Sequence, residues 1–397
     1  MSDYLKEFRP PYRILMGPGP SSVHPRVLQA MTSPILGHLD PDFLRVMDDV
    51  IEMLRLVLQT SNKLTLPLSG TGTAGMEAAF CNMVEPGDTV VIAINGFFGN
   101  RMADIASRCG AEAHTVESPW GKPIGPDLSA LEEELKKHRR VKVLGVVHGE
   151  TSTGVLNPLP EIANLAHRYD ALLIADAVTS LGGEEVAVDR WDVDVCFSAT
   201  QKCLGAPPGL APISLGPRAA RALRERQSVV QSFYLNLVDL ESYWSAEKRV
   251  YHHTAPISMI YALREALRMT IEEGLEARIQ RHARNASALR AGLEAIGLEL
   301  FADPGHRLNP LTTVVVPQGV SDARVRRRLL LDYGIEIGGG LGEIAGRVWR
   351  IGLMGDSSRE SNVLAFLSAL ERILPEEGFE VAQGSGVADA QRALASS

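Results

Sequence analysis

Short apolar runs alternate with longer amphipathic segments through most of the chain. The apolar runs are rich in β-branched residues and predict strands at 89–94, 141–147, 171–175, 193–198 and 210–215. The amphipathic segments between them predict helices at 73–84, 100–108, 127–138 and 159–169. Strands that alternate with helices are typical of βαβ units. We therefore expect an α/β fold with a mixed, mostly parallel sheet flanked by helices.

The pattern changes in the last third of the chain. Two long amphipathic helices are expected at 257–273 and 275–296. Strands expected at 298–301, 312–316, 335–338 and 348–351 then alternate with two helices. This second series predicts a small C-terminal α/β domain.

These changes suggest how the chain divides. We expect an N-terminal arm at 1–20, a large domain at 21–275, a small C-terminal domain at 276–380 and a flexible tail at 381–397. The arm contains too many prolines for regular structure and is expected to wrap onto another part of the molecule. The tail is rich in Gly, Ala and Ser, as frayed chain ends often are.

The composition is that of an ordinary globular enzyme, with 45% hydrophobic and 22% charged residues. A net charge of -8 argues against nucleic acid and anionic membranes as partners, because both require a basic surface. The N-terminus lacks an apolar signal core, and no apolar run approaches the ~20 residues of a membrane helix. These features predict a cytoplasmic protein. The four cysteines form no CxxC pair, which argues against structural zinc.

Two residues that follow predicted strands carry the main chemical signal. Lys202 lies between the strand at 193–198 and a Gly/Pro-rich stretch, and Asp176 directly follows the strand at 171–175. A lysine amine can hold an aldehyde cofactor covalently, and a carboxylate can keep a pyridine nitrogen protonated. Alone, each residue has a structural explanation, as a surface charge or a helix cap. Their joint position after parallel strands favours a pyridoxal phosphate site.

Three other positions after strands fit such a site. The glycine-rich turn at 69–75 precedes a predicted helix, whose first amides can bind a phosphate. Helix capping without a ligand also explains this turn, which matches neither of the common nucleotide-binding glycine patterns. Phe98 could stack on a planar ring or belong to the core, and Thr151 could bind a phenolic oxygen or form a turn.

A series of motifs in order gives the sequence a family resemblance. They are GPGPS at 17–21, SGTG at 69–72, NG at 95–96, HGETSTGV at 148–155, DAVTSLGG at 176–183, SATQK at 198–202, APPG at 206–209, YHHT at 251–254 and RIG at 350–352. On these motifs the chain resembles the class V aminotransferases of pyridoxal-phosphate fold type I. Within that class it is similar in particular to the alanine–glyoxylate (serine–pyruvate) aminotransferases.

The resemblance implies pyridoxal 5′-phosphate as the cofactor and a role for each residue around it. Lys202 bonds the cofactor and moves the substrate α-proton, and Asp176 keeps the pyridine nitrogen protonated. Val178 and Phe98 pack on the two ring faces, and Thr151 contacts the phenolic oxygen region. The phosphate is held by Thr71, Gly72, Thr73 and Gln201, and from a neighbouring subunit by Tyr251 and Thr254.

Two of these positions depart from the usual family pattern. Relatives often have Trp where this chain has Phe98, so the stacking area here is smaller. They often have His where this chain has Thr73, which leaves a backbone contact to the phosphate. The subunit-spanning contacts imply an obligate homodimer with shared active sites.

The resemblance also implies how the substrate is bound. Arg350 is the expected partner of the substrate carboxylate, because a guanidinium pairs with it through two hydrogen bonds. Gly19 is expected to offer its backbone amide to the same group. No metal site is expected, because adjacent side chains such as those of His252 and His253 diverge and have no flanking ligands.

The expected activity is the transfer of an amino group from a small L-amino acid, alanine or serine, to glyoxylate or pyruvate by ping-pong kinetics. Serine–glyoxylate and (S)-ureidoglycine–glyoxylate aminotransferases share the scaffold and stay open as alternatives. A cysteine desulfurase needs a late cysteine, whereas none follows Cys203. A pyridoxal-phosphate-binding regulatory protein without catalysis is the alternative from another class, and the presence of Lys202, Asp176 and Arg350 argues against it.

Overall fold

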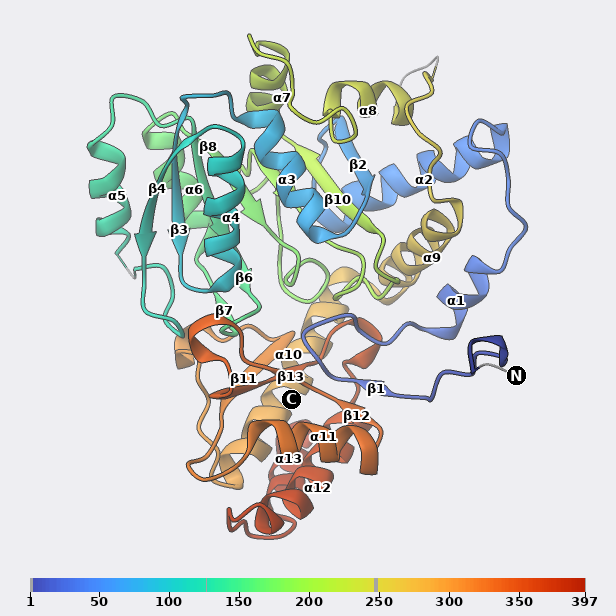
Figure 1. Ribbon diagram of the computed structural model, residues 1–397, viewed down its shortest axis with the longest axis vertical. Helices are drawn as coiled ribbons and strands as arrows, with labels where there is room; N and C mark the ends of the chain where they lie inside the picture. The colour runs from blue at the N-terminus through green and yellow to red at the C-terminus, as the bar shows by residue number, and fades with distance from the viewer. Residues whose placement is uncertain (1–2, 126, 246–248, 397) are drawn as a thin grey trace.

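A seven-stranded sheet forms the centre of the larger part of the molecule (Figure 1). The computed structural model describes residues 3–125, 127–245 and 249–396. In spatial order the strands are β2 (Leu64–Ser69), β10 (Leu210–Leu215), β9 (Val195–Phe197), β8 (Leu172–Asp176), β5 (Val143–Val147), β3 (Thr89–Ile94) and β4 (Glu112–Glu117). Strand β10 runs in the direction opposite to the other six strands, so its pairs with β2 and β9 are antiparallel and all other pairs are parallel. The expected mixed, mostly parallel sheet is confirmed.

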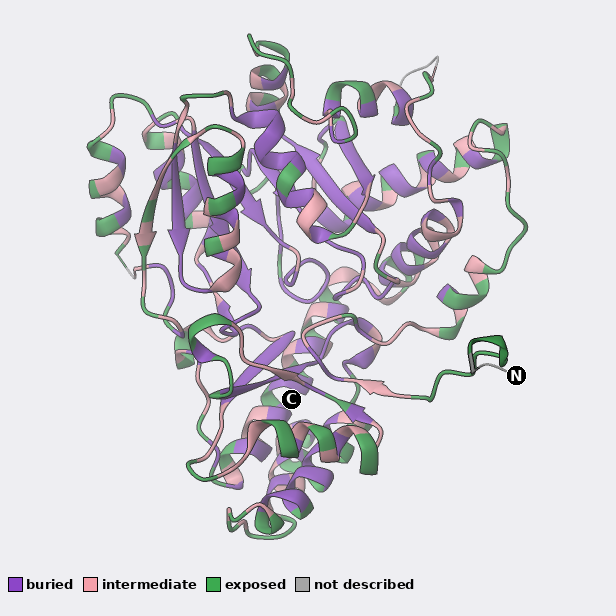
Figure 2. Ribbon diagram, viewed as in Figure 1, coloured by how far each residue is buried: buried purple, intermediate pink, exposed green. Residues whose placement is uncertain are grey.

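Helices cover the sheet, and Figure 2 shows that the central strands are buried. These helices are α2 (Pro41–Leu58), α3 (Gly72–Met83), α4 (Phe97–Arg108), α5 (Ser129–Lys136), α6 (Leu159–Arg168), α7 (Pro217–Arg224), α8 (Leu237–Trp244) and α9 (Ile257–Glu273), and the short helix α1 (Pro25–Met31) packs against α9. Every residue of β5 and β8 is buried, as in a sheet covered on both faces. Helix α2 shows how sequence sets a boundary: Asp40 accepts a hydrogen bond from the Asp42 amide, and Pro41 occupies the first turn.

The smaller part of the molecule has its own core. Its elements are α10 (Leu275–Ala295), β11 (Leu311–Val315), α11 (Asp322–Asp332), β12 (Ile335–Glu336), β13 (Gly338–Gly339), β14 (Val348–Gly352) and α12 (Glu360–Glu376). Strand β14 pairs antiparallel with β11 and β13. Leu289, Trp349 and Phe366 belong to one buried cluster, separate from that of the large sheet. The proposed domain limits stay a prediction that these two clusters support.

The N-terminal arm contains more regular structure than its prolines predict. Strand β1 (Ile14–Leu15) pairs in parallel with β12, and the Met16 amide donates to Glu336 O at 2.8 Å. Met16 is fully buried in the second core. A proline-free stretch therefore joins the arm to the small domain. Met1 and Ser2 lie outside the described residues.

The chain end also differs from the sequence prediction. Its composition predicts a flexible tail, whereas the structure has a helix, α13 (Ser385–Ala395). Gly386, Ala390 and Leu394 recur every four residues and are buried. Small residues on this stripe let α13 pack closely against α10 and α12. The Gly/Ala content thus marks a packing surface here.

Two smaller differences concern strands. The strand expected at 298–301 is reduced to a single bridge between Leu300 and Val314. Strands β2 and β4 were not predicted, because one contains a proline and the other is a half-exposed edge strand.

No helix in the described residues has the length and apolar character needed to cross a membrane.

Candidate active site

The candidate site lies where β5, β8 and β9 end. Asp176 is the last residue of β8, and Lys202 lies in the loop between β9 and β10. Both line a cavity of about 150 Å³. The predicted site residues that line it are Gly19, Thr71, Gly72, Thr73, Phe98, Thr151, Asp176, Val178, Gln201 and Lys202. Parallel strands thus bring together residues that are far apart in the sequence.

Asp176 is a buried carboxyl group, 4% exposed. Its Oδ1 accepts a hydrogen bond of 2.8 Å from the Val178 amide. Burial raises the pKa of Asp176 to about 7, and the negative charge of Glu150 acts in the same direction. A positively charged N–H donor in the cavity would reverse this shift.

Lys202 is a buried amine, 8% exposed, which donates to the carbonyl oxygen of Pro18. Burial lowers its pKa to about 8, and the positive charge of Arg350 lowers it further against the attraction of Asp176. Gly19 allows the lysine to extend past it: a Cβ there would lie 2.7 Å from Lys202 Cδ. Its φ of +102° also disfavours other residues. The amine is therefore prepared for nucleophilic or base chemistry.

The glycine-rich turn offers unpaired polar groups to the cavity. Thr71 occupies the N-cap position of α3. The amides of Gly72 and Thr73 donate no hydrogen bond within the described part of the chain. Gln201 Oε1 is buried and has no hydrogen-bond partner. The free amides at a helix N-terminus make this end of the cavity suitable for an anion.

Glu150 is a buried carboxyl group for which the sequence analysis gave no role. Its Oε2 accepts from the amides of Phe98 and Gly99 at 3.2 Å each, and its Oε1 accepts from Ser152 Oγ at 2.6 Å. Burial raises the pKa of Glu150, whereas these hydrogen bonds lower it. Glu150 thereby fixes the start of α4 and the ring of Phe98. Gly96 is required there, because a Cβ would lie 2.4 Å from Glu150 Cγ.

Arg101 is a second residue that the sequence analysis missed. It lies one turn after Phe98 on α4 and lines the cavity. Its Nη1 donates to Thr73 Oγ1 at 3.1 Å, and its guanidinium carbon lies 5.0 Å from the centre of the Phe98 ring. No carboxylate forms an ion pair with it among residues 3–125, 127–245 and 249–396. The sequence did contain a signal for Arg101: three residues after Phe98 on one helix, it is expected on the same helix face as that ring.

Arg350 lies on β14, in the small domain, and reaches the large one. Its Nε donates to Gly339 O at 2.7 Å and its Nη1 to Thr151 O at 3.3 Å. The residue is 6% exposed, and burial lowers its pKa to about 10. It forms no ion pair with any carboxylate that the structure describes. A buried guanidinium without an acidic partner is suited to receive an anionic ligand.

Tyr251 and Thr254 do not line the cavity. Both are exposed, Tyr251 by 55%, and their hydroxyl oxygens lie 3.4 Å apart. The neighbouring His253 has a clear orienting contact, because its Nε2 lies 2.6 Å from Oγ of Ser69 in the glycine-rich turn. The predicted contact of Tyr251 and Thr254 with a second subunit stays a prediction.

Comparison with known proteins identifies the family. The pattern of Aminotransferase class-V matches residues 15–348. This chain belongs to the class-V aminotransferases. It is 42% identical over 387 residues to an (S)-ureidoglycine–glyoxylate transaminase of Bacillus subtilis, covering 93% of this chain and 92% of that protein.

Two further relatives give the aminotransferase a wider context. An alanine–glyoxylate aminotransferase of Drosophila melanogaster is 40% identical over 368 residues, covering 92% of this chain and 93% of that protein. The crystal structure of an alanine–glyoxylate aminotransferase from Nostoc sp. superposes with a TM-score of 0.91 at 49% identity. That match covers 93% of this chain and 97% of the other. The resemblance inferred from the motifs is confirmed.

The lowered pKa of Lys202 predicts a distinct pH dependence in the aminotransferase without cofactor. Reductive methylation by formaldehyde requires the neutral amine, so its rate at Lys202 should rise through about pH 8. Lys137 is the internal control, because Glu134 raises its pKa. Peptide mass spectrometry after short reaction times measures both residues in one sample. Equal pH profiles for the two lysines would contradict the argument.

Proposed function

We propose that the aminotransferase binds pyridoxal 5′-phosphate and transfers an amino group from a small L-amino acid, alanine or serine, to glyoxylate or pyruvate. The observation that carries this proposal is the shared cavity of Lys202 and Asp176, two buried ionisable groups with shifted pKa values. Glyoxylate as acceptor is supported by the names of the relatives from Bacillus subtilis, Drosophila melanogaster and Nostoc sp.. We also propose a cytoplasmic location.

The residues around the cavity fit this cofactor. When bound, the cofactor supplies an electron sink for the bonds at the substrate α-carbon. Asp176 would accept the hydrogen bond of the pyridine N–H, which would give its buried carboxylate the cationic partner that it lacks. Phe98 and Val178 would contact the ring, and Thr151 its phenolic oxygen. The residues that would hold the phosphate are Thr71, Gly72, Thr73 and Gln201.

Arg101 adds a positive charge to this phosphate site. Its contact with Thr73 Oγ1 puts the guanidinium beside the free amides of α3. Where relatives often carry His, Thr73 has no charge of its own. Arg101 from the next helix therefore compensates for that departure from the family pattern.

Arg350 and Lys202 act on the substrate. Arg350 binds the α-carboxylate through the two-pronged guanidinium, and the amide of Gly19 supports the same group. Lys202 then takes the α-proton as a base, because its lowered pKa keeps part of the amine neutral near pH 8. Within the same half-reaction Lys202 would pass this proton on to the cofactor, and water would release the oxo acid of the donor. The second half-reaction would run these steps in reverse on the acceptor oxo acid. The two half-reactions give ping-pong kinetics.

A second copy of the chain completes the site. Tyr251 and Thr254 are exposed, and so is Phe233, by 73%. Exposed aromatic residues in one region are typical of a protein interface. We propose that a homodimer buries them and that Tyr251 and Thr254 reach the partner's phosphate site.

Ureidoglycine–glyoxylate transamination is the second candidate. The observation behind it is the 42% identity to the Bacillus subtilis enzyme, which lies between the identities to the alanine–glyoxylate relatives of Drosophila melanogaster, 40%, and Nostoc sp., 49%. Serine–glyoxylate transamination also fits the same carboxylate site. A binding protein without catalysis is disfavoured, because Arg350, which is assigned to the substrate carboxylate, serves no purpose in merely holding a ring and a phosphate.

The test is the visible absorbance of the purified protein loaded with pyridoxal phosphate. Addition of L-alanine or L-serine should bleach the band of the lysine-bound cofactor, and glyoxylate should restore it. L-Aspartate is the control donor and should not bleach the band, because no arginine is assigned to bind its side-chain carboxylate. (S)-Ureidoglycine tests the second candidate in the same format.

The outcomes distinguish an error in the proposed donor from an error in the proposed catalysis or in the proposed cofactor. If ureidoglycine alone bleaches the band, the proposed donor is wrong and the proposed cofactor site stands. A stable band with every donor would support the binding protein. Absence of any band after cofactor addition, in a folded protein, would reject the cofactor and with it the whole proposal.

The role of Arg350 predicts the effect of its conservative variant. Arg350→Lys keeps the positive charge but loses the planar guanidinium that can pair with a carboxylate through two hydrogen bonds. We therefore expect kcat/KM for alanine to fall by about 30-fold, which corresponds to about 2 kcal/mol. The cofactor absorbance should stay unchanged, because Arg350 contacts the substrate. The matched control is Arg347→Lys, an exposed position three residues earlier. Equal kinetics of the two variants would contradict the assignment.

A further inference from the structure

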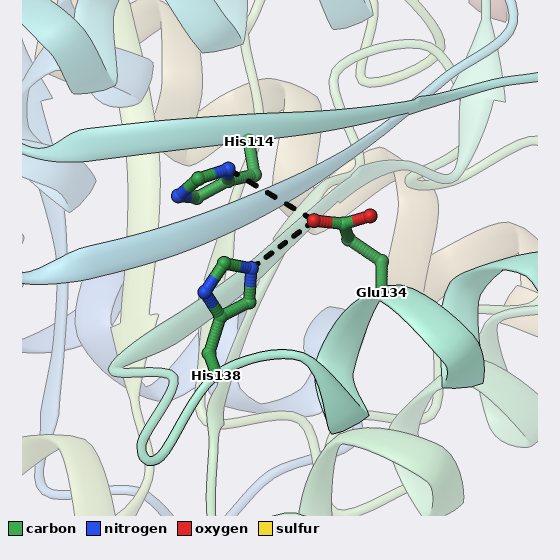
Figure 3. Close-up of side chains that lie close together, drawn as sticks. All are labelled: His114, Glu134 and His138. Carbon is green, nitrogen blue, oxygen red and sulfur yellow. Dashed lines mark hydrogen bonds and ion pairs between the residues drawn. The ribbon is translucent and has the colours of Figure 1, made fainter.

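Three potential metal ligands converge at the edge of the large sheet (Figure 3). None of them lines the cavity of the candidate active site. His114 lies on β4, Glu134 lies on α5, and His138 follows the end of that helix. Their side chains are 39%, 14% and 18% exposed, respectively. This is the one such trio of His, Cys, Asp or Glu side chains within the described residues.

The fold explains why these three side chains meet. Glu134 lies in the last turn of α5 and His138 lies just beyond its end, where the chain turns back so that His138 Nε2 reaches Glu134 Oε1. Strand β4 is the edge of the sheet and pairs on one side only, with β3. Helix α5 packs against both strands, which brings His114 to the Glu134–His138 pair.

The distances suit a transition-metal ion. Glu134 Oε1 lies 3.1 Å from His138 Nε2 and 3.9 Å from His114 Nδ1. All three ligand atoms lie within 4.8 Å of one another. Ligands of tetrahedral zinc, bound at about 2.0–2.2 Å, are about 3.3 Å apart. Small side-chain movements would therefore bring all three atoms into coordination.

The chemical types of the three ligands limit which metal ions could bind here. Two imidazoles and one carboxylate match the donors of three-ligand zinc sites, which leave a further position to water. Mg²⁺ and Ca²⁺ prefer oxygen ligands alone.

We propose that His114, Glu134 and His138 form a binding site for a divalent transition-metal ion such as Zn²⁺. The ion joins the edge strand β4 to helix α5 and is independent of the cofactor site. Lys137 limits the affinity, because its Nζ lies 2.7 Å from Glu134 Oε2. In the sequence, CxxC spacing is absent and the adjacent pair His252 and His253 was the visible metal signal, whereas these ligands span His114 to His138 and meet only through the fold.

Equilibrium dialysis of the cofactor-loaded protein against ZnCl₂ tests the site. The wild type should bind one Zn²⁺ per chain that His114→Ala does not bind at the same concentration. Lys137→Met should bind this ion a few-fold more tightly, because the competing ammonium group is removed. His306→Ala, at a partly exposed histidine elsewhere in the chain, is the control and should behave as wild type.

The sign of the Lys137 effect separates a metal site from a simple hydrogen-bonded cluster. Zinc uptake that is equal in wild type and His114→Ala would overturn the proposal, and so would weaker uptake by Lys137→Met. A measurement on the wild type alone guards against misfolded variants. Co²⁺ should add visible absorption bands that Zn²⁺ removes, and a visible spectrum that Co²⁺ leaves unchanged would equally overturn the proposal.

Discussion

The burial of unpaired charge around one cavity is the constraint on which the rest of this site depends. Asp176 and Lys202 are both nearly inaccessible to water, and burial moves their pKa values to about 7 and about 8. Arg350 is buried without an acidic partner among the described residues. Burying such groups costs free energy that a closely packed core must offset. The cost would be recovered when ligands of opposite charge bind, which is what the proposed cofactor and substrate would supply.

The two parts of the molecule, each with its own buried cluster, contribute different residues to this arrangement. The buried sheet brings Asp176 to the end of β8, and Glu150 fixes the start of α4 through two backbone amides. The small domain supplies Arg350, which hydrogen-bonds to Thr151 O. A substrate held by Arg350 would thus touch both domains. Positioning by rigid strands and a capped helix keeps these groups in place before any ligand binds.

How far the sequence predicted the site depends on where each signal lies. Lys202 and Asp176 could be found because both follow apolar strands. Glu150 lay within a recognised motif but received no role, because its partners, the Phe98 and Gly99 amides, are about fifty residues away. Strand β4 and helix α13 were missed because a half-exposed edge strand lacks a strong apolar pattern and small residues imitate a flexible tail.

The most direct test of buried charge compares Asp176→Asn with wild type in thermal unfolding at pH 8, with and without pyridoxal phosphate. A pKa raised to about 7 means that stability falls as pH rises from about 4 to about 7, so at pH 8 the ionised carboxylate destabilises the protein without cofactor. The variant, which can keep the hydrogen bond from Val178, should then unfold at the same or a higher temperature. With cofactor, wild type should gain more stability. Equal gains in the two proteins would contradict the account.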